Sequence, residues 1–414
     1  MSVTQDLGEG TLGAAPDRVG HDGRWSGGRG RVLLCSSNGG GLGHLTRLMA
    51  VARRLPDDVD AVFVTMSQGL PLVTREGYTA EYIPTAATLD ADAGTWQHYL
   101  RQRMDTLIAH YRPDVLVYDG VSLYPGLVDS WGAHDGCVRV WLRRAMWRPG
   151  AGVPAGHEAF DLVLEPGDIA AANALGATVG EGVGVAPDAG VGTGAGVGAG
   201  GRVRRVDPIV HLDERELLPR AAARQALGLD PERPAALLSL GAGNINNIAA
   251  IITRIAGSLG AGGDVQAVAV RSPIAAAADD AGDLDGVLVR SVYPVSRYLR
   301  AFDVAFAAAG YNSFHELIAF AVPTVFVPNE HAIVDDQGAR ARFAEWAGAA
   351  LAVSEWSTAE LAASVEALLD PHVQARLTYN CRRVFPGNGA AAAAELLATL
   401  AVARREPATA GSRG

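Results

Sequence analysis

Residues 308–317 read AAGYNSFHEL, residues 322–328 read VPTVFVP, and residues 335–337 read DDQ. A glycine turn at Gly310 opens a helix, whose first backbone N–H groups and positive dipole end attract an anion. The Ser313 hydroxyl adds a donor for a phosphate. Glu316 follows on the same helix face, where its carboxylate can accept hydrogen bonds from ribose hydroxyls. The loop after the buried strand carries carboxylates and an amide that suit a polyol, so the segment predicts a site for a nucleotide diphosphate sugar.

This segment resembles the C-terminal half of GT-B glycosyltransferases, and is most similar to the branch (family 28 C-terminal domain) that contains the peptidoglycan N-acetylglucosaminyltransferase and the UDP-glycosyltransferases. The resemblance implies an α/β fold of two Rossmann-like, doubly wound parallel-sheet domains that face each other across a cleft. It assigns Gly310, Asn312 and Ser313 to the donor diphosphate, Glu316 to the ribose, and Asp336 and Gln337 to the donor sugar. Asp335 is then expected to cap the next helix. The alternative is an ordinary β-α-β unit with polar loops.

Composition narrows the classes of function. The chain has 414 residues, which suits two domains with full cores, and its net charge of -10 argues against nucleic acid as the main partner. The cysteines, Cys35, Cys137 and Cys381, are too widely spaced for a disulfide framework or a metal site, so a reducing cytoplasm is expected. No run of 18 apolar residues occurs, so no transmembrane helix is expected.

Alternating apolar runs and helical patterns predict a parallel sheet in each domain. The expected strands are 31–35, 61–65, 114–119, 138–142 and 160–164 in the first domain, and 235–240, 265–270, 287–289, 304–308 and 324–327 in the second. The expected divisions are a disordered leader (1–29), an acceptor-binding domain (30–206) with a flexible Gly/Ala-rich insertion (176–201), a linker (207–219), a nucleotide-sugar domain (220–388), a helix that crosses back to the first domain (389–404) and a disordered tail (405–414).

A glycine-rich loop, NGGGLGH over residues 38–44, separates the first strand from a helix expected over 45–55. The resemblance implies that Gly41 and Gly43 let the backbone approach the donor diphosphate and that His44 faces the cleft. A histidine at a helix N-terminus is biased toward its neutral form, so His44 is a candidate general base, with N-capping or core packing as alternatives. The resemblance also suggests Asp119 as the carboxylate that orients it. Arg47 is expected on the exposed helix surface, with a phosphate or acidic acceptor contact as the alternative.

Two loops of the second domain complete the expected donor site. Gly241, Gly243 and Asn244 follow a strand and open a helix, and the resemblance implies backbone contact with the phosphates, while Asn244 can instead cap the helix. Val292 and Tyr293 are implied to pair with the nucleotide base through their backbone. Arg271 ends the preceding strand, either near the nucleotide or in solvent.

The expected activity is inverting, metal-independent transfer of a sugar from a nucleotide diphosphate sugar, a UDP-sugar foremost, to an acceptor hydroxyl, with no cofactor and no metal. A nucleotide-sugar epimerase and a non-catalytic sugar-nucleotide-binding protein are the alternatives. The acceptor itself is not identified. Trp96, Tyr99, Trp131, Trp141 and Trp147 are candidates for an apolar acceptor pocket, with core packing as the alternative. Arg139, Arg143, Arg144 and Arg148 form a basic cluster that is either a solvated surface or a weak peripheral contact with anionic lipid or a phosphorylated acceptor.

Overall fold

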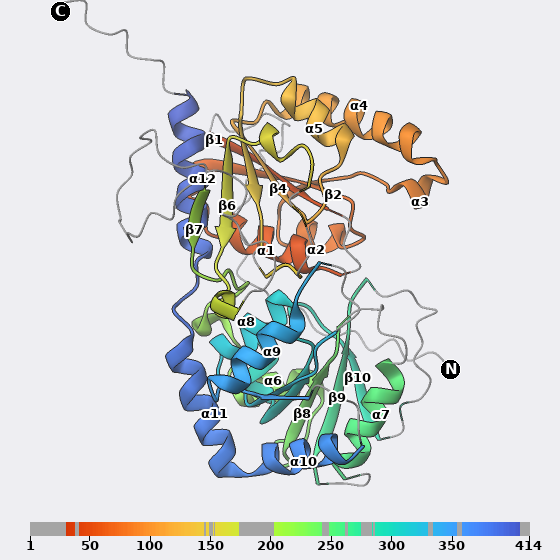
Figure 1. The fold of residues 1–414 in the computed structure, drawn as a ribbon, viewed down its shortest axis with the longest axis vertical. Coiled ribbons are helices and arrows are strands. Elements are labelled where there is room, and N and C mark those ends of the chain that lie inside the picture. The colour runs from red at the N-terminus through yellow and green to blue at the C-terminus, as the bar shows by residue number, and fades with distance from the viewer. Residues whose placement is uncertain are drawn as a thin grey trace, which may run out of the picture.

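The computed structural model of the chain consists of two α/β domains, each built on a parallel sheet, which lie one above the other in Figure 1. The structure describes residues 30–37, 41–144, 146–148, 152, 154–173, 203–241, 248–260, 264–274, 284, 286–329, 334–353 and 358–405. The expected leader, the expected insertion and residues 406–414 of the expected tail lie outside these ranges.

The first sheet has seven strands in the order β3-β2-β1-β4-β5-β6-β7. They are β1 (Gly30–Ser36), β2 (Val59–Thr65), β3 (Thr79–Tyr82), β4 (Val115–Asp119), β5 (Val138–Leu142), β6 (Leu162–Pro166) and β7 (Val203–Val206). All neighbours are parallel, and Val32 lies opposite Ala61 on one side and Val115 on the other. The central strands are apolar on both faces because helices cover both.

Helices of the first domain divide between the two faces of this sheet. They are α1 (Gly43–Ala52), α2 (Leu70–Arg75), α3 (Ala86–Leu89), α4 (Ala93–Tyr111) and α5 (Pro125–Gly132), with short turns η1 (His157–Ala159) and η2 (Ala171–Asn173). Leu45 and Leu48 of α1 pack on one face, and Leu100 of α4 and Trp131 of α5 pack on the other. The first helix begins earlier than the sequence predicts, so His44 lies within its first turn.

The second sheet has six parallel strands in the order β10-β9-β8-β11-β12-β13. They are β8 (Ala235–Ser239), β9 (Gln266–Arg271), β10 (Val287–Ser291), β11 (Val304–Ala307), β12 (Thr324–Phe326) and β13 (Leu351–Ala352). The surrounding helices are α6 (Arg220–Leu227), α7 (Ile248–Ser258), α8 (Tyr311–Ala319), α9 (Gln337–Trp346), α10 (Thr358–Leu369) and α11 (Pro371–Val384), with short turns η3 (Glu214–Glu216) and η4 (Val295–Ala301). Each domain is therefore a doubly wound α/β unit with its own core.

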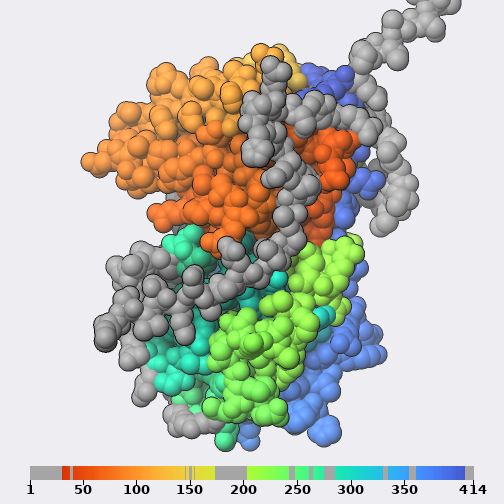
Figure 2. All heavy atoms as spheres, turned by 180° about the vertical axis from the view of Figure 1, so that it is seen from behind, coloured from red at the N-terminus to blue at the C-terminus, as the bar shows by residue number. Residues whose placement is uncertain are grey.

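The last helix, α12 (Ala390–Arg405), packs on the first domain although it follows the second in the chain. Its buried face consists of small side chains, and a Cβ at Gly30 would lie 2.7 Å from the Cβ of Ala401, so only glycine permits this close approach. The helices coloured blue in Figures 1 and 2 extend along both lobes. None of the helices that the structure describes is both long and apolar enough to cross a membrane.

Candidate active site

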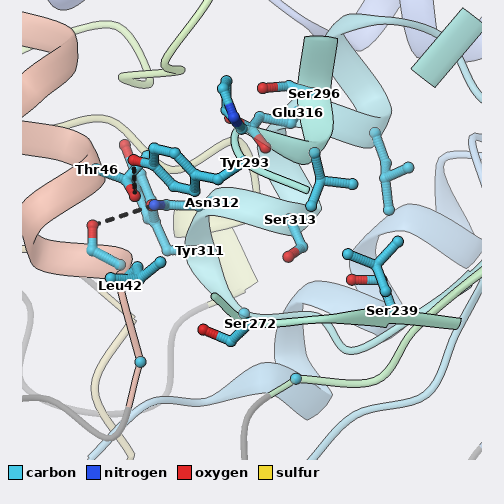
Figure 3. A pocket seen from close by; sticks show the side chains of 18 of the residues that line it. Leu42, Thr46, Ser239, Ser272, Tyr293, Ser296, Tyr311, Asn312, Ser313 and Glu316 are labelled. Atoms are coloured by element: carbon cyan, nitrogen blue, oxygen red, sulfur yellow. Dashed lines mark hydrogen bonds between the residues drawn. The ribbon is translucent and has the colours of Figure 1, made fainter. Parts of the chain in front are cut away.

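A cavity of about 480 Å³ lies between the two domains and is lined by residues of both (Figure 3). The first domain contributes Gly41 to His44, Thr46, Arg47 and Arg144. The second domain contributes, among others, Gly241, Arg271, Val292 to Ser296, Gly310 to Ser313, Glu316, Asp335 and Gln337. The cavity thus lies at the carboxyl ends of the parallel strands, where open α/β sheets bind ligands.

His44 and Asp119 form a hydrogen-bonded pair at the first-domain side of the cavity. His44 Nδ1 lies 2.7 Å from Asp119 Oδ1, and the Asp119 side chain is 1% exposed at the end of β4. An ionised carboxylate can only accept, so Nδ1–H of His44 donates a hydrogen bond to Asp119, which leaves the lone pair of the neutral imidazole on Nε2. The structure therefore brings together the two residues that the sequence singled out as base and orienting carboxylate.

Electrostatics favour a neutral His44 beside a charged Asp119. Burial lowers the pKa of His44, and Arg47 and Arg144 add to this effect, while Asp119 opposes it. Burial alone would raise the pKa of Asp119, but the charge of Arg47 and the hydrogen bonds from His44 and Arg47 outweigh it and lower the pKa. A neutral imidazole with a carboxylate on one nitrogen can accept a proton at the other.

The turn at the start of α8 faces the glycine loop across the cavity. Gly310 is the N-cap of α8, and within the described residues no side chain caps this helix end. The Asn312 amide donates to the carbonyl oxygen of Gly43 over 3.1 Å and so joins the turn to the first domain. Ser313 also lines the cavity. The arrangement leaves a helix N-terminus available to an anion in the cavity.

Glu316 lies one turn further along α8, next to Ser296 (Figure 3). Burial raises the pKa of Glu316, although His211 and Ser296 act in the opposite direction. A buried carboxylate of this kind gains from hydroxyl donors such as those of a ribose.

Val292 and Tyr293 line the cavity beside Glu316. The Tyr293 hydroxyl lies 2.8 Å from the hydroxyl of Thr46 in the first domain, so this residue also connects the domains. Arg271 lines the same end of the cavity, which favours the interpretation that places it near the nucleotide.

The acidic pair before α9 is arranged differently from the expectation. The expectation that Asp335 caps the helix is wrong, because Asp336 is the N-cap and accepts from the backbone N–H of Ala339 over 2.9 Å. Asp335 instead lines the cavity and pairs with Arg144 and Arg340. Gln337 also lines the cavity, and its side-chain oxygen accepts from the backbone N–H of Asn329, which turns its amide nitrogen toward Gly310.

The sequence did not predict that Arg47 and Arg144 line the cavity beside His44. The expectation that Arg47 lies on the helix surface is wrong, because it is 2% exposed and faces Asp119. Neither is the basic cluster of residues 139–148 a surface patch. Arg143 is 1% exposed between Trp141 and Trp147, Arg144 lines the cavity, and Arg139 pairs with Asp161. Only the tertiary neighbours, and no local pattern, could have identified these positions.

Aromatic residues considered for an acceptor pocket belong mainly to the core. Trp96, Trp131, Trp141 and Trp147 are all at most 5% exposed in the core of the first domain. The core alternative is therefore correct for these residues. Of the other expected donor residues, Gly243 and Asn244 lie outside the described residues, while Gly241 lines the cavity with a φ of 92° that favours glycine.

Comparison with known proteins identifies similar folds and a family model that matches part of the second domain. Residues 290–383 match the model of the glycosyltransferase family 28 C-terminal domain. No curated protein sequence matches the chain. A solved glycosyltransferase of kitacinnamycin is similar over 90% of this chain and 99% of its own, with a TM-score of 0.60 at 19% identity.

Two further solved structures have the same fold. Acinetobacter baumannii MurG covers 89% of this chain and 99% of its own, with a TM-score of 0.54 and 14% identity. The calicheamicin glycosyltransferase CalG4 covers 91% of this chain and 99% of its own, with a TM-score of 0.56 and 16% identity. These likenesses and the two parallel sheets confirm the GT-B fold, and the matched domain confirms the glycosyltransferase class that the sequence predicted.

Proposed function

We propose that this glycosyltransferase, whose residues 290–383 form a family 28 C-terminal domain, transfers a sugar from a UDP-sugar to an acceptor hydroxyl with inversion and without a metal ion. One observation carries the proposal. His44 of the first domain, hydrogen-bonded to the buried Asp119, and the residues Gly310 to Ser313 at the open N-terminus of α8 in the second domain line one interdomain cavity. A proton acceptor and a helix end suited to bind an anion therefore face the same cavity.

The donor is oriented by the second domain. The diphosphate lies at the turn Gly310 to Ser313, the ribose hydroxyls donate to Glu316, and the base lies against Val292 and Tyr293. Gln337 presents its amide to the sugar, and Asp335 supplies the carboxylate at this end of the cavity. Asp336 is committed to the helix cap, so we assign it a smaller part in sugar binding than the sequence suggested.

The chemical step is a single displacement. His44 Nε2 takes the proton of the acceptor hydroxyl as its oxygen bonds to the anomeric carbon, and the bond from that carbon to the diphosphate breaks on the opposite face. Asp119 stabilises the imidazolium that forms, as a carboxylate does for a catalytic histidine. The electron pair of the broken bond leaves with the diphosphate, and the anomeric configuration is inverted.

Charge on the leaving diphosphate is balanced by the protein itself. The backbone N–H groups at the start of α8 supply preorganised dipoles, and one well-placed donor of this kind can contribute about 3–4 kcal/mol. Arg47 and Arg144 add positive charge at the same cavity. Within the described residues, no group of three or more His, Cys, Asp or Glu side chains is arranged to hold a metal ion.

The first domain supplies the acceptor side of the cavity, and the acceptor is any molecule that presents a hydroxyl to His44.

All three cysteines are unpaired and buried, which is compatible with the reducing cytoplasm that we propose as the compartment. An epimerase of the same fold and a non-catalytic nucleotide-sugar binder are the competing functions, and both would use the same donor site.

Donor consumption distinguishes these functions. Purified protein is incubated with UDP-, GDP- and TDP-sugars, with and without a panel of hydroxyl acceptors, and the products are identified by mass spectrometry and NMR. We expect release of the nucleoside diphosphate, inverted anomeric configuration in the product, and unchanged turnover in EDTA. An isomerised nucleotide sugar would indicate an epimerase, and nucleotide binding without turnover would indicate a binding protein. Loss of turnover in EDTA that Mg²⁺ restores would contradict the metal-independent mechanism.

A further inference from the structure

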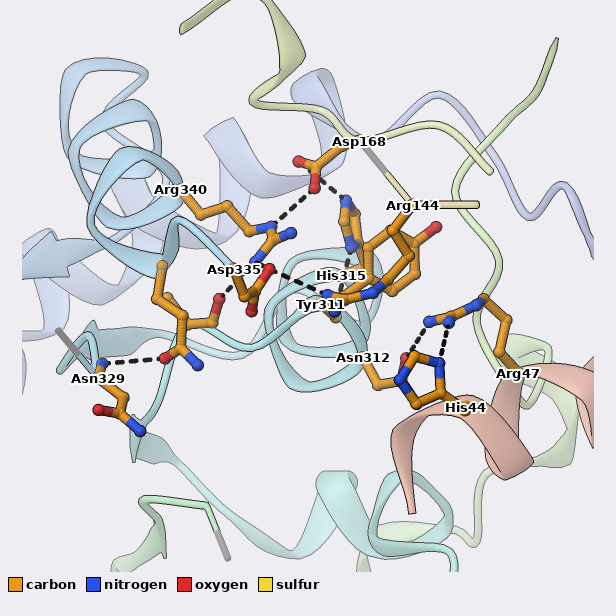
Figure 4. Close-up of polar contacts among 12 residues, drawn as sticks. His44, Arg47, Arg144, Asp168, Tyr311, Asn312, His315, Asn329, Asp335 and Arg340 are labelled. Atoms are coloured by element: carbon orange, nitrogen blue, oxygen red, sulfur yellow. Dashed lines mark hydrogen bonds and ion pairs between the residues drawn. The ribbon is translucent and has the colours of Figure 1, made fainter. Parts of the chain in front are cut away.

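Arg47 is a buried cation between the proposed base and the second domain. It lies one helical turn after His44 on α1, and its side chain is 1% exposed (Figure 4). A guanidinium this deep in the protein costs free energy unless its donors are paired with acceptors. Its contacts therefore indicate what it does.

One contact is shared with His44. Arg47 Nη2 donates to Asp119 Oδ1 over 2.6 Å, and His44 Nδ1 lies 2.7 Å from the same oxygen. Nη2 and Nδ1 are 3.2 Å apart, so both groups converge on a single carboxylate oxygen. The guanidinium has only donors, so Asp119 is the common acceptor. This geometry fixes the orientation of the carboxylate and the proton on Nδ1 of His44.

Other contacts reach the second domain. Arg47 Nη1 lies 3.5 Å from the side-chain oxygen of Asn312, whose amide donates to the carbonyl of Gly43. The guanidinium carbon lies 5.0 Å from the centre of the Tyr311 ring, a distance typical of a cation–π contact. Both partners belong to the turn that opens α8, where we place the donor diphosphate.

We propose that Arg47 is a positioning residue that holds Asp119 against His44 and ties this pair to the donor-binding turn at Tyr311 and Asn312. The inference rests on the proposed function for its catalytic meaning. Arg47 acts through Asp119 and does not itself receive the proton. It keeps the base in its proton-accepting form and at a fixed position relative to the donor.

The charges around His44 determine the direction of the expected pH effect. Asp119 on β4, Arg47 on α1 and Arg144 after β5 face the imidazole, and Asp335 reaches the same region through its pair with Arg144. On the turn that opens α8, Tyr311 and Asn312 contact Arg47, and neither side chain is charged at neutral pH. Removing the positive charge of Arg47 leaves Asp119 free to stabilise the imidazolium, so the pKa of His44 should rise.

The decisive measurement is an NMR titration of labelled histidines in the ligand-free protein, with His44 assigned through loss of its signal in H44A. In R47Q we expect the pKa of His44 to rise by about one unit, which lowers the neutral fraction about tenfold at pH values below both pKa values. R47K keeps the positive charge but loses the simultaneous contacts of the guanidinium with Asp119 and with the turn of α8. We therefore expect the pKa of His44 in R47K to stay near its wild-type value, while kcat is reduced.

Two further variants separate the two connections of Arg47. N312A removes the contact of Arg47 with the Asn312 side chain and leaves Arg47 on Asp119 and over the Tyr311 ring, so the titration of His44 should not change while kcat falls. R53Q is the matched control, because Arg53 is the C-cap of α1, at the opposite end of this helix from His44, and also pairs with carboxylates, Glu76 and Glu216. It should leave the His44 titration and turnover unchanged.

An unchanged His44 pKa in a folded R47Q protein would overturn the inference, as would an equal shift in R53Q. Circular dichroism and the melting temperature establish whether R47Q is folded. If it is not, R47K tests the inference through kcat, and wild-type turnover in R47K would overturn it. The titration needs no substrate. A shift in R47Q together with no turnover in the wild-type protein would therefore reject the proposed function and keep the structural role of Arg47.

Discussion

Asp168 of the first domain and Arg340 of the second form an ion pair in which neither side chain is exposed, with 2.7 Å between Asp168 Oδ2 and Arg340 Nε (Figure 4). Arg340 Nη1 also donates to Asp335 over 2.8 Å, so one guanidinium connects the end of the first sheet to the cavity wall. His315 lies beside the pair and accepts from the backbone N–H of Ile169. His315 thus has a structural role, and the domains are joined by a buried polar network.

The substitution Asp168→Asn should destabilise the protein by about 3–5 kcal/mol, because it leaves a buried guanidinium without its main counter-charge. Urea unfolding gives the free energy. The control is Arg103→Gln, which breaks a more exposed pair with Glu81 and should cost no more than about 1 kcal/mol. Equal effects of the two substitutions would show that the buried pair has no special importance.

The same pair predicts how the stability of the protein falls in acid. Burial alone would raise the pKa of Asp168, but Arg340 and His315 outweigh it and hold the pKa well below its usual range. The stabilisation is therefore complete above the unfolded-state pKa of an aspartate, decreases as the pH falls below that value, and is fully lost once the pH falls through the much lower folded-state pKa. Unfolding followed between pH 5 and 2, expressed as wild type minus Asp168→Asn, should show this dependence.

Turnover should depend on His44 and remain high at mildly acidic pH. His44→Ala should lower kcat by about 10²–10⁴ and leave nucleotide affinity within a few-fold, because the base does not hold the donor. The pKa of His44 is lowered, so the neutral form persists below the usual value of 6.5. The acidic limb of kcat/KM should therefore lie below pH 6.5 and disappear with the histidine. A limb unchanged in residual His44→Ala activity would exclude this residue as its origin.

The substitution Glu316→Gln should separate stability from binding. The folded-state pKa of Glu316 is raised, so its ionised form at pH 7 costs stability that an amide would not, and the melting temperature should rise. Loss of a charged acceptor for the ribose should weaken binding by about 1.5–3 kcal/mol, roughly 10- to 100-fold in Kd for UDP. Calorimetry and a thermal melt of the same samples measure both effects. Unweakened UDP binding would remove Glu316 from the ribose site.

The two residues at the start of α9 should behave differently. Asp336→Ala removes a helix cap and should cost about 0.5–2 kcal/mol of stability, with a small effect on the donor KM. Gln337→Ala should leave stability nearly unchanged and raise the donor KM, because its amide faces the cavity. Steady-state kinetics and unfolding of both variants test this assignment. The reverse pattern would return Asp336 to the sugar-binding role that the sequence suggested.

The alternation of strands and helices was predictable from the sequence, because short continuous apolar runs such as 114–119 and 304–308 are typical of strands that are buried on both faces of a parallel sheet. The edge strands β3, β7 and β13 were missed. They are short, and their residues are only partly buried or exposed, as in the VRRV of β7, so no apolar pattern identifies them.

The sequence by itself determined the two parallel sheets, the helix opening at Gly310 and the candidates His44, Asp119 and Glu316, because each depends on a local pattern or on the end of a strand. Only the tertiary structure decided that Arg47 and Arg144 are buried in the cleft, and that Asp336 caps α9 while Asp335 faces the cavity. Those outcomes depend on which charges meet across the domain interface. An arginine on a short helix has the same local pattern in water and in a buried ion pair, and only its distant partners distinguish the two.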